Sequence, residues 1–125
     1  NGVRSQQNYY LSKRITLLEK SEKVILLLGD FNASSKHESL ESLYDKGFVA
    51  LTEKKFRHPS SNNRSQGSSK RNTVIDHIMV IPAATGEWIE QSTMLYPPAN
   101  PEQFQQRFSD HLPVWADFRT DHDAD

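Results

Sequence analysis

The stretch VILLLGDFN, residues 24–32, decides the fold. Its apolar part, residues 24–28, is the longest apolar run in the chain, and it falls well short of the ~20 residues that a membrane span requires. A run of this length with β-branched residues, followed by Gly-Asp, predicts a buried strand that ends in a turn. Asp30 and Asn32 follow two residues apart and therefore point to the same side of an extended chain. They belong either to an ordinary turn or to a site at the end of the strand.

Helices are expected on both sides of this strand. Before it, apolar residues recur at helical spacing among charged ones, which predicts an amphipathic helix over residues 4–21. After it, Ser35 and Glu38 form a capping box and predict a second helix that starts near Ser35. Gly47 stands where a glycine cap would end that second helix.

Strand-like and loop-like segments fill the rest of the chain. Strands are expected at residues 48–51, 73–81, 88–96 and 112–118, and loops at residues 57–72 and around Pro97, Pro98 and Pro101. This order predicts an α/β (α+β) fold in which one mixed, mostly antiparallel sheet carries two helices on one face. The acidic residues 120–125 are expected to form a disordered tail.

The composition excludes several classes of protein. The chain has 125 residues and is therefore one domain at most. Its formal net charge of -1 argues against a globally basic nucleic-acid coat or a polybasic membrane binder. Because there is no cysteine, disulfides, thiolate zinc sites and cysteine nucleophiles are excluded. The chain starts at Asn1 without a signal-peptide pattern, so its start is interpreted as a truncation point, and the compartment stays open.

Asp76 is a polar residue on an apolar strand face. Its neighbours on that face are Val74, Ile78 and Val80, so an ionised carboxylate there needs a cation or a hydrogen-bond donor as its partner. His77 points to the opposite face, and we assign it a structural role.

Asp110 and His111 lead into the last expected strand. Carboxylates are suitable ligands for Mg²⁺ or Mn²⁺, and an imidazole can contact a phosphate and move a proton near neutral pH. If the sheet brings these two residues to the same edge as Asp30, Asn32 and Asp76, the set is suited to metal-assisted hydrolysis of phosphoesters. Each group taken alone is also compatible with an ordinary turn or strand boundary.

Three motifs, in order, resemble blocks of the endonuclease/exonuclease/phosphatase superfamily, the deoxyribonuclease I-like group. They are LLGDFN at residues 27–32, VIDHI at residues 74–78 and SDHLPV at residues 109–114. The resemblance covers residues 1–119 and implies that they form the C-terminal half of such a domain, with residues 120–125 as a tail. The complete fold would be a four-layer α/β sandwich, of which this chain would be half.

The resemblance implies a role for each matching residue. Asp30 would activate the attacking water, and Asn32 would donate hydrogen bonds to the scissile phosphate. His111 would contact that phosphate and act in proton transfer, and Asp76 would hold its ring in orientation. Asp110 would contribute to a Mg²⁺ site, with Mn²⁺ as a common substitute.

This chain departs from the family in what it lacks. The upstream half of the family's domain supplies the main metal-ligating Glu, and no segment here matches that half. The isolated chain is therefore expected to be inactive or weakly active. The sheet face that would meet the absent half is expected to be an exposed apolar patch that favours self-association.

The substrate is expected to be DNA or RNA. Residues 54–71 are the one strongly basic segment, and Arg57, Arg64 and Arg71 within it either follow a phosphate backbone or belong to an ordinary solvated loop. Two alternatives stay open. One is a phosphodiesterase or phosphatase for lipids or small phosphoesters, and the other is a truncated module without catalytic activity.

Overall fold

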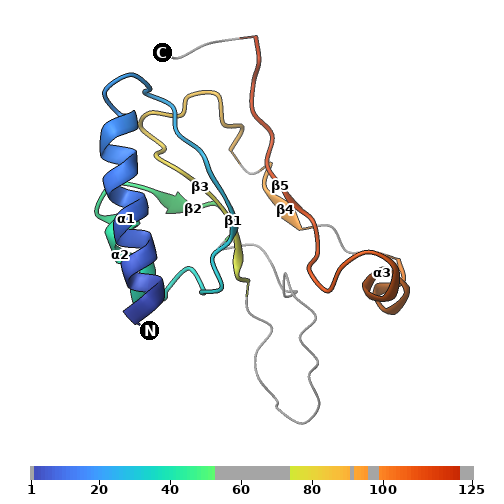
Figure 1. Cartoon of the computed structure of the whole chain (residues 1–125). Helices are drawn as coiled ribbons and strands as arrows, with labels where there is room; N and C mark the ends of the chain where they lie inside the picture. Colours follow the sequence, from blue (N-terminus) through green and yellow to red (C-terminus); the bar gives the residue numbers. More distant parts are fainter. Residues whose placement is uncertain (1, 53–73, 91, 96–98, 122–125) are drawn as a thin grey trace.

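The computed structural model describes residues 2–52, 74–90, 92–95 and 99–121, and its elements give an α+β fold, as expected. In chain order they are α1 (Gly2–Leu18), β1 (Leu27–Asp30), the 3-10 helix η1 (Glu38–Leu40), α2 (Glu41–Tyr44), β2 (Val49–Ala50), β3 (Asp76–Val80), β4 (Met94–Leu95), α3 (Pro101–Arg107) and β5 (Val114–Trp115) (Figure 1). No helix within these ranges has the length and apolar character needed to cross a bilayer. The loop expected at residues 57–72 and most of the expected tail lie outside the described residues.

The described strands form two antiparallel ladders. In the first, β3 lies between β1 and β2, and in the second β4 pairs with β5. The expectation of one mixed sheet is therefore wrong for the described part of the chain, where every pair of named strands is antiparallel. The reason is the last segment, since β5 lies beside β3 but forms its ladder with β4.

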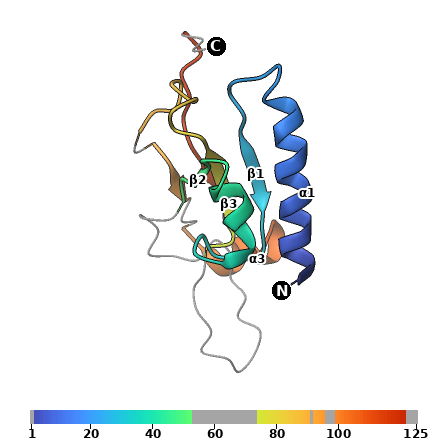
Figure 2. The same cartoon turned by 90° about the vertical axis from the view of Figure 1, so that its left-hand side faces the viewer.

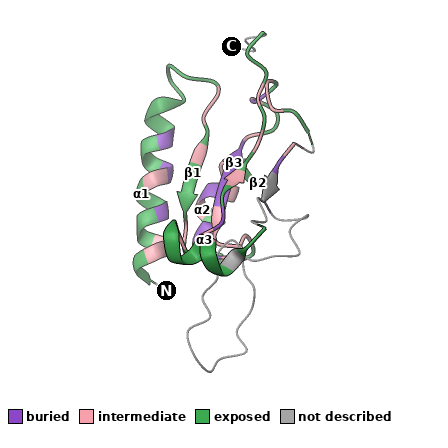
Figure 3. Ribbon diagram, turned by 90° about the vertical axis from the view of Figure 1, so that its right-hand side faces the viewer, coloured by how far each residue is buried: buried purple, intermediate pink, exposed green. Residues whose placement is uncertain are grey.

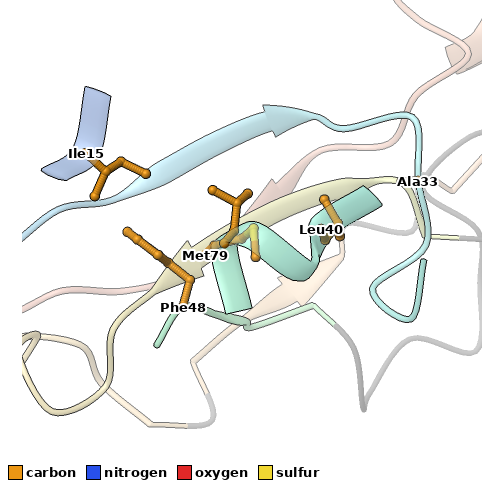
Figure 4. Packing of buried hydrophobic residues seen from close by; sticks show 6 residues of the cluster. Ile15, Ala33, Leu40, Phe48 and Met79 are labelled. Atoms are coloured by element: carbon orange, nitrogen blue, oxygen red, sulfur yellow. The ribbon is translucent and has the colours of Figure 1, made fainter. Parts of the chain in front are cut away.

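Two helices on one face of the sheet were expected, and this arrangement is confirmed. The helix α1 packs against η1 and α2, and all three cover the same side of the three-stranded sheet (Figure 2). The core forms between these helices and the sheet, and its buried residues are Ile15, Ala33, Leu40, Leu43, Phe48 and Met79 (Figure 4).

The face of α1 that packs against the rest of the protein is more polar than the sequence pattern predicts. Its buried residues are Asn8, Ser12 and Ile15, which share one helix face, whereas Tyr10 and Leu17 are exposed. The side chain of Asn8 donates a hydrogen bond of 2.8 Å to the backbone carbonyl of Ser39. This bond gives a buried amide group a partner and ties α1 to η1.

The expected capping box at the start of the second helix is wrong. The N-cap is His37, whose Nδ1 accepts a hydrogen bond of 3.1 Å from the backbone N–H of Ser39. The reason is a turn just before the helix, in which the N–H of His37 bonds to the carbonyl of Ser34 at 2.8 Å. Ser35 lies inside this turn, and its carbonyl accepts a hydrogen bond from the hydroxyl of Tyr44.

Gly47 ends the second helix as expected. Its φ of 90° lies in the left-handed region that favours glycine. The N–H of Gly47 bonds to the carbonyl of Tyr44 at 2.8 Å, and the N–H of Phe48 bonds to the carbonyl of Leu43 at 3.3 Å. These two bonds form a Schellman motif, and the buried side chains of Phe48 and Leu43 supply its apolar contact.

The helix α3 lies where a proline-rich loop was expected, so that expectation is wrong from Pro101 onward. Asn100 is its N-cap, and the side-chain oxygen of Asn100 accepts a hydrogen bond of 2.9 Å from the N–H of Gln103. Pro101 occupies the first turn, where its missing N–H costs nothing.

The sheet face opposite α1 is open along β1, so the expectation of a buried strand is wrong for this face. Leu27 packs against the core, but Leu28 is 66% exposed, because its side chain points to the other side. Figure 3 shows β1 mostly exposed and β3 mostly buried. A groove of about 510 Å³ runs along this face between β1, β3 and the β5 segment, and Leu26, Leu28, Ile78, Leu112 and Trp115 are among its lining residues.

Candidate functional site

The ladder between β1 and β3 brings two of the expected site residues together. Asp30 on β1 and Asp76 on β3 are direct partners in the antiparallel register, so their side chains lie on the same face of the sheet. Asp30 is exposed, and Asp76 is half-buried. Two carboxylates 46 positions apart in the sequence therefore lie side by side at one end of the β1–β3 ladder, and both line the apolar groove.

His111 completes this cluster, and the expected contact with Asp76 is present. Its Nδ1 lies 3.0 Å from Oδ1 and 2.9 Å from Oδ2 of Asp76. Because a carboxylate accepts hydrogen bonds, Nδ1 carries the proton and Nε2 remains as the ring nitrogen for a substrate. The half-buried carboxylate of Asp76 thus has the hydrogen-bond donor that its apolar surroundings require.

The charge around His111 favours its protonated form. The hydrogen bond that His111 donates to Asp76 raises the pKa of the imidazole above its ordinary value of 6.5, and partial burial opposes this effect. The negative charges of Asp76, Asp110 and Asp30 raise the pKa further. A larger share of His111 is therefore protonated near neutral pH than of an isolated histidine.

The turn after β1 positions Asn32 next to Asp30. The N–H of Asn32 donates a hydrogen bond of 2.7 Å to Oδ1 of Asp30, and the φ of Asn32 is 49°, a left-handed conformation that Asn tolerates. The carbonyl of Asn32 accepts a hydrogen bond of 2.7 Å from the guanidinium of Arg4 on α1. The turn therefore fixes Asp30 and Asn32 relative to each other and to α1.

Three of these side chains could hold a metal ion. One ligand atom each from Asp30, Asp76 and His111 lie within 4.8 Å of one another. Asp110, which we expected to ligate the metal, is not in this group, although its charge acts on His111. The donor set fits Mg²⁺ in part, because Mg²⁺ is usually held by one or two carboxylates, with waters and substrate phosphates at the other positions.

The structure does not place every residue of the expected site. Arg57, Arg64 and Arg71 lie outside the described residues, so their expected contact with a phosphate backbone stays a prediction. His77, to which we assigned a structural role, is buried and hydrogen-bonded at both ring nitrogens.

Comparison with known protein families, with curated proteins and with solved structures finds no match to this chain. The resemblance to the endonuclease/exonuclease/phosphatase superfamily therefore rests on the three sequence motifs, and membership of that family stays a prediction.

Proposed function

We propose that this chain takes part in metal-dependent hydrolysis of phosphodiesters, with DNA or RNA as the substrate. The observation that carries the proposal is the pairing of His111 with both carboxylate oxygens of Asp76, with Asp30 directly across the ladder. A protonated imidazole held by one carboxylate and flanked by a second supplies an acid and a base within one small area. Hydrolysis of a phosphodiester needs both, because a water must lose a proton and the leaving oxygen must gain one.

Each residue has a task in this mechanism. Asp30 accepts the proton of the attacking water, since its carboxylate is exposed. His111, with Nδ1 held by Asp76, uses Nε2 to donate a hydrogen bond to the phosphate or a proton to the leaving oxygen. Asn32 offers amide N–H groups to the phosphate from the same turn as Asp30.

Asp30 and Asp76 are the carboxylates that would hold a divalent cation here. Such a cation, expected to be Mg²⁺ or Mn²⁺, supplies positive charge that offsets the charge developing on the phosphate oxygens.

The test is cleavage of plasmid DNA, RNA and bis(p-nitrophenyl) phosphate with Mg²⁺ and with EDTA. We expect His111→Ala to lower the rate by at least about 100-fold, as is usual for a general acid or base. Asp76→Asn should lower it by about 10- to 100-fold, because it weakens the hold on the His111 ring and removes one of the two carboxylates that would hold the cation. Asp45→Asn, an exposed carboxylate at the end of α2, is the matched control and should cleave like the wild type.

Each result has a separate meaning. Cleavage that persists in EDTA contradicts the metal requirement, and cleavage that persists in His111→Ala contradicts the site. Absence of cleavage by the wild type favours the non-catalytic alternative for this chain.

One observation favours a second substrate class. The apolar groove that begins at Asp30 and Asp76 continues along Leu28, Leu112 and Trp115, where it could accept an acyl chain of a phospholipid. Hydrolysis of phosphatidylcholine or sphingomyelin vesicles in the same assay, at a rate above that of DNA and RNA, would support the lipid alternative.

A further inference from the structure

We propose that His77 is a positioning residue that holds the turn carrying Asp30 and Asn32, through a hydrogen bond from its ring to the backbone of Ala33. This inference rests on the proposed function, because it concerns the same site. It changes the role of His77 from a residue of the core to one on which the geometry of that site depends.

The turn lies at the surface, where its own hydrogen bond and the bond from Arg4 to the carbonyl of Asn32 are both exposed. Asp30 and Asn32 are both exposed, and the bond between them joins two residues of the same turn. The next residue, Ala33, is only 3% exposed, and its carbonyl lies 2.8 Å from Nε2 of His77. The chain therefore passes directly from the exposed turn to a buried point that His77 holds.

The direction of this bond follows from its partners. A backbone carbonyl can only accept, so Nε2 of His77 carries the proton and donates to Ala33. In the neutral ring with this tautomer, Nδ1 is an acceptor, and the hydroxyl of Thr52 at 2.6 Å is the donor. Thr52 and His77 are both fully buried, so water does not compete for these bonds. Partners on two separate segments thus fix the ring in one orientation.

The turn is also attached to β3 at a second point. The ring of Phe31 lies 5.8 Å from the ring of His77, between centroids, and the N–H of Phe31 donates a bond of 3.0 Å to the carbonyl of Ile75. Successive residues of β3 then hold opposite sides of the site. Asp76 holds His111 on the groove side, and His77 holds the turn on the core side.

Two amide variants separate the hydrogen bond to Ala33 from the packing of the ring. In His77→Gln the amide nitrogen lies as many bonds from Cα as Nε2 does and can still reach Ala33. In His77→Asn the amide lies at the position of Nδ1 and can reach only Thr52. We expect His77→Gln to keep most of the Mg²⁺-dependent cleavage, and His77→Asn to lose about 10- to 100-fold in kcat with a smaller change in KM. Thr52→Val should show a smaller loss in the same direction, since it removes only the donor to Nδ1.

Met79→Leu is the matched control, because Met79 is buried on the same strand and face as His77 but its side chain has no N–H or O–H that could donate a hydrogen bond to the turn. It should cleave like the wild type. Equal losses in His77→Gln and His77→Asn, or wild-type rates in both, would overturn the proposal.

A second measurement does not depend on activity. Amide hydrogen exchange of Phe31 and Asn32, which both donate hydrogen bonds, should be about tenfold faster in His77→Asn than in the wild type or His77→Gln. The amide of Asp45, bonded to Glu41 in the second helix, should exchange at the same rate in all three. If the wild type does not cleave, the proposed function fails while this measurement still decides the role of His77. Unchanged exchange at Phe31 and Asn32 overturns it.

Discussion

The Asp76–His111 pair determines how the candidate site responds to pH. Because the hydrogen bond to Asp76 is the largest cause of the raised pKa of His111, we expect Asp76→Asn to lower that pKa toward 6.5. Asp110→Asn should lower it by a smaller amount, since Asp110 acts only through its charge. NMR titration of the His111 ring in the three proteins measures these shifts. An unchanged pKa in Asp76→Asn would contradict the pairing.

The same pair links stability to pH with a definite sign. The folded state raises the pKa of His111 above its unfolded value of 6.5, so folding favours the protonated ring. The stabilisation is complete below pH 6.5 and is lost as the pH rises through the folded pKa. Urea unfolding of the wild type and His111→Ala should therefore show a larger difference in free energy at about pH 6 than at about pH 9. The same difference at both pH values would show that the ring contributes only through packing.

The residues of the site differ in how far the sequence could predict them. Side-chain chemistry predicts that Asp76 has a cation or a donor as its partner, because it is a carboxylate on an apolar strand face, whereas the choice of His111 as that partner came from the family resemblance. The bond between His77 and the carbonyl of Ala33 could not be predicted in this way, because every residue has a carbonyl and the pattern carries no signal for which one is used. The position of Asp110 outside the metal-ligand cluster depends on the path of the chain before β5, which side-chain types do not specify.

At the level of elements, Gly47 is a position where the backbone favours glycine. A Cβ there would meet only Ile81 Cγ2, at an ordinary contact distance of 3.6 Å, so the cost of a side chain comes from the φ of 90°. We expect Gly47→Ala to lower the free energy of unfolding by about 1 kcal/mol, measured by urea denaturation. Gly2→Ala is the matched control, because Gly2 lies in the first turn of α1 with open space around it. The free energy of unfolding of this variant should equal that of the wild type or be slightly higher. Equal effects of the two substitutions would contradict the role of the Schellman motif.

The elements also show why their boundaries were harder to predict than their existence. Residues 4–21 and the strand in residues 73–81 have clear periodicity, and α1 and β3 lie there. The predicted start of the second helix was wrong, because a Ser/Glu pair at this spacing is common in sequences. The turn that begins at Ser34 places the N-cap at His37 instead. The helix α3 was missed although Asn100 and Pro101 are typical of a helix start, because three nearby prolines favoured a loop.

At the level of the whole molecule, the sheet face away from α1 carries exposed apolar side chains. Leu28 is 66% exposed there and borders the groove with Trp115, and β1 is an edge strand of its sheet. Exposed apolar surface next to an unpaired strand edge favours association between chains. A three-stranded antiparallel sheet with helices on one side is present, whereas the four-layer sandwich stays a prediction.

We therefore expect the wild type to self-associate with rising concentration, as measured by light scattering. Leu28→Lys should reduce this association, because it introduces a charge both on the apolar face and on the edge strand. Leu17→Lys is the matched control, since Leu17 is 53% exposed but lies on α1, away from the groove. It removes a comparable exposed leucine and should leave the association unchanged. If Leu17→Lys reduced association as much as Leu28→Lys does, general surface hydrophobicity would be the cause. A wild type that stays monomeric over the whole concentration range would show that the groove face does not drive association.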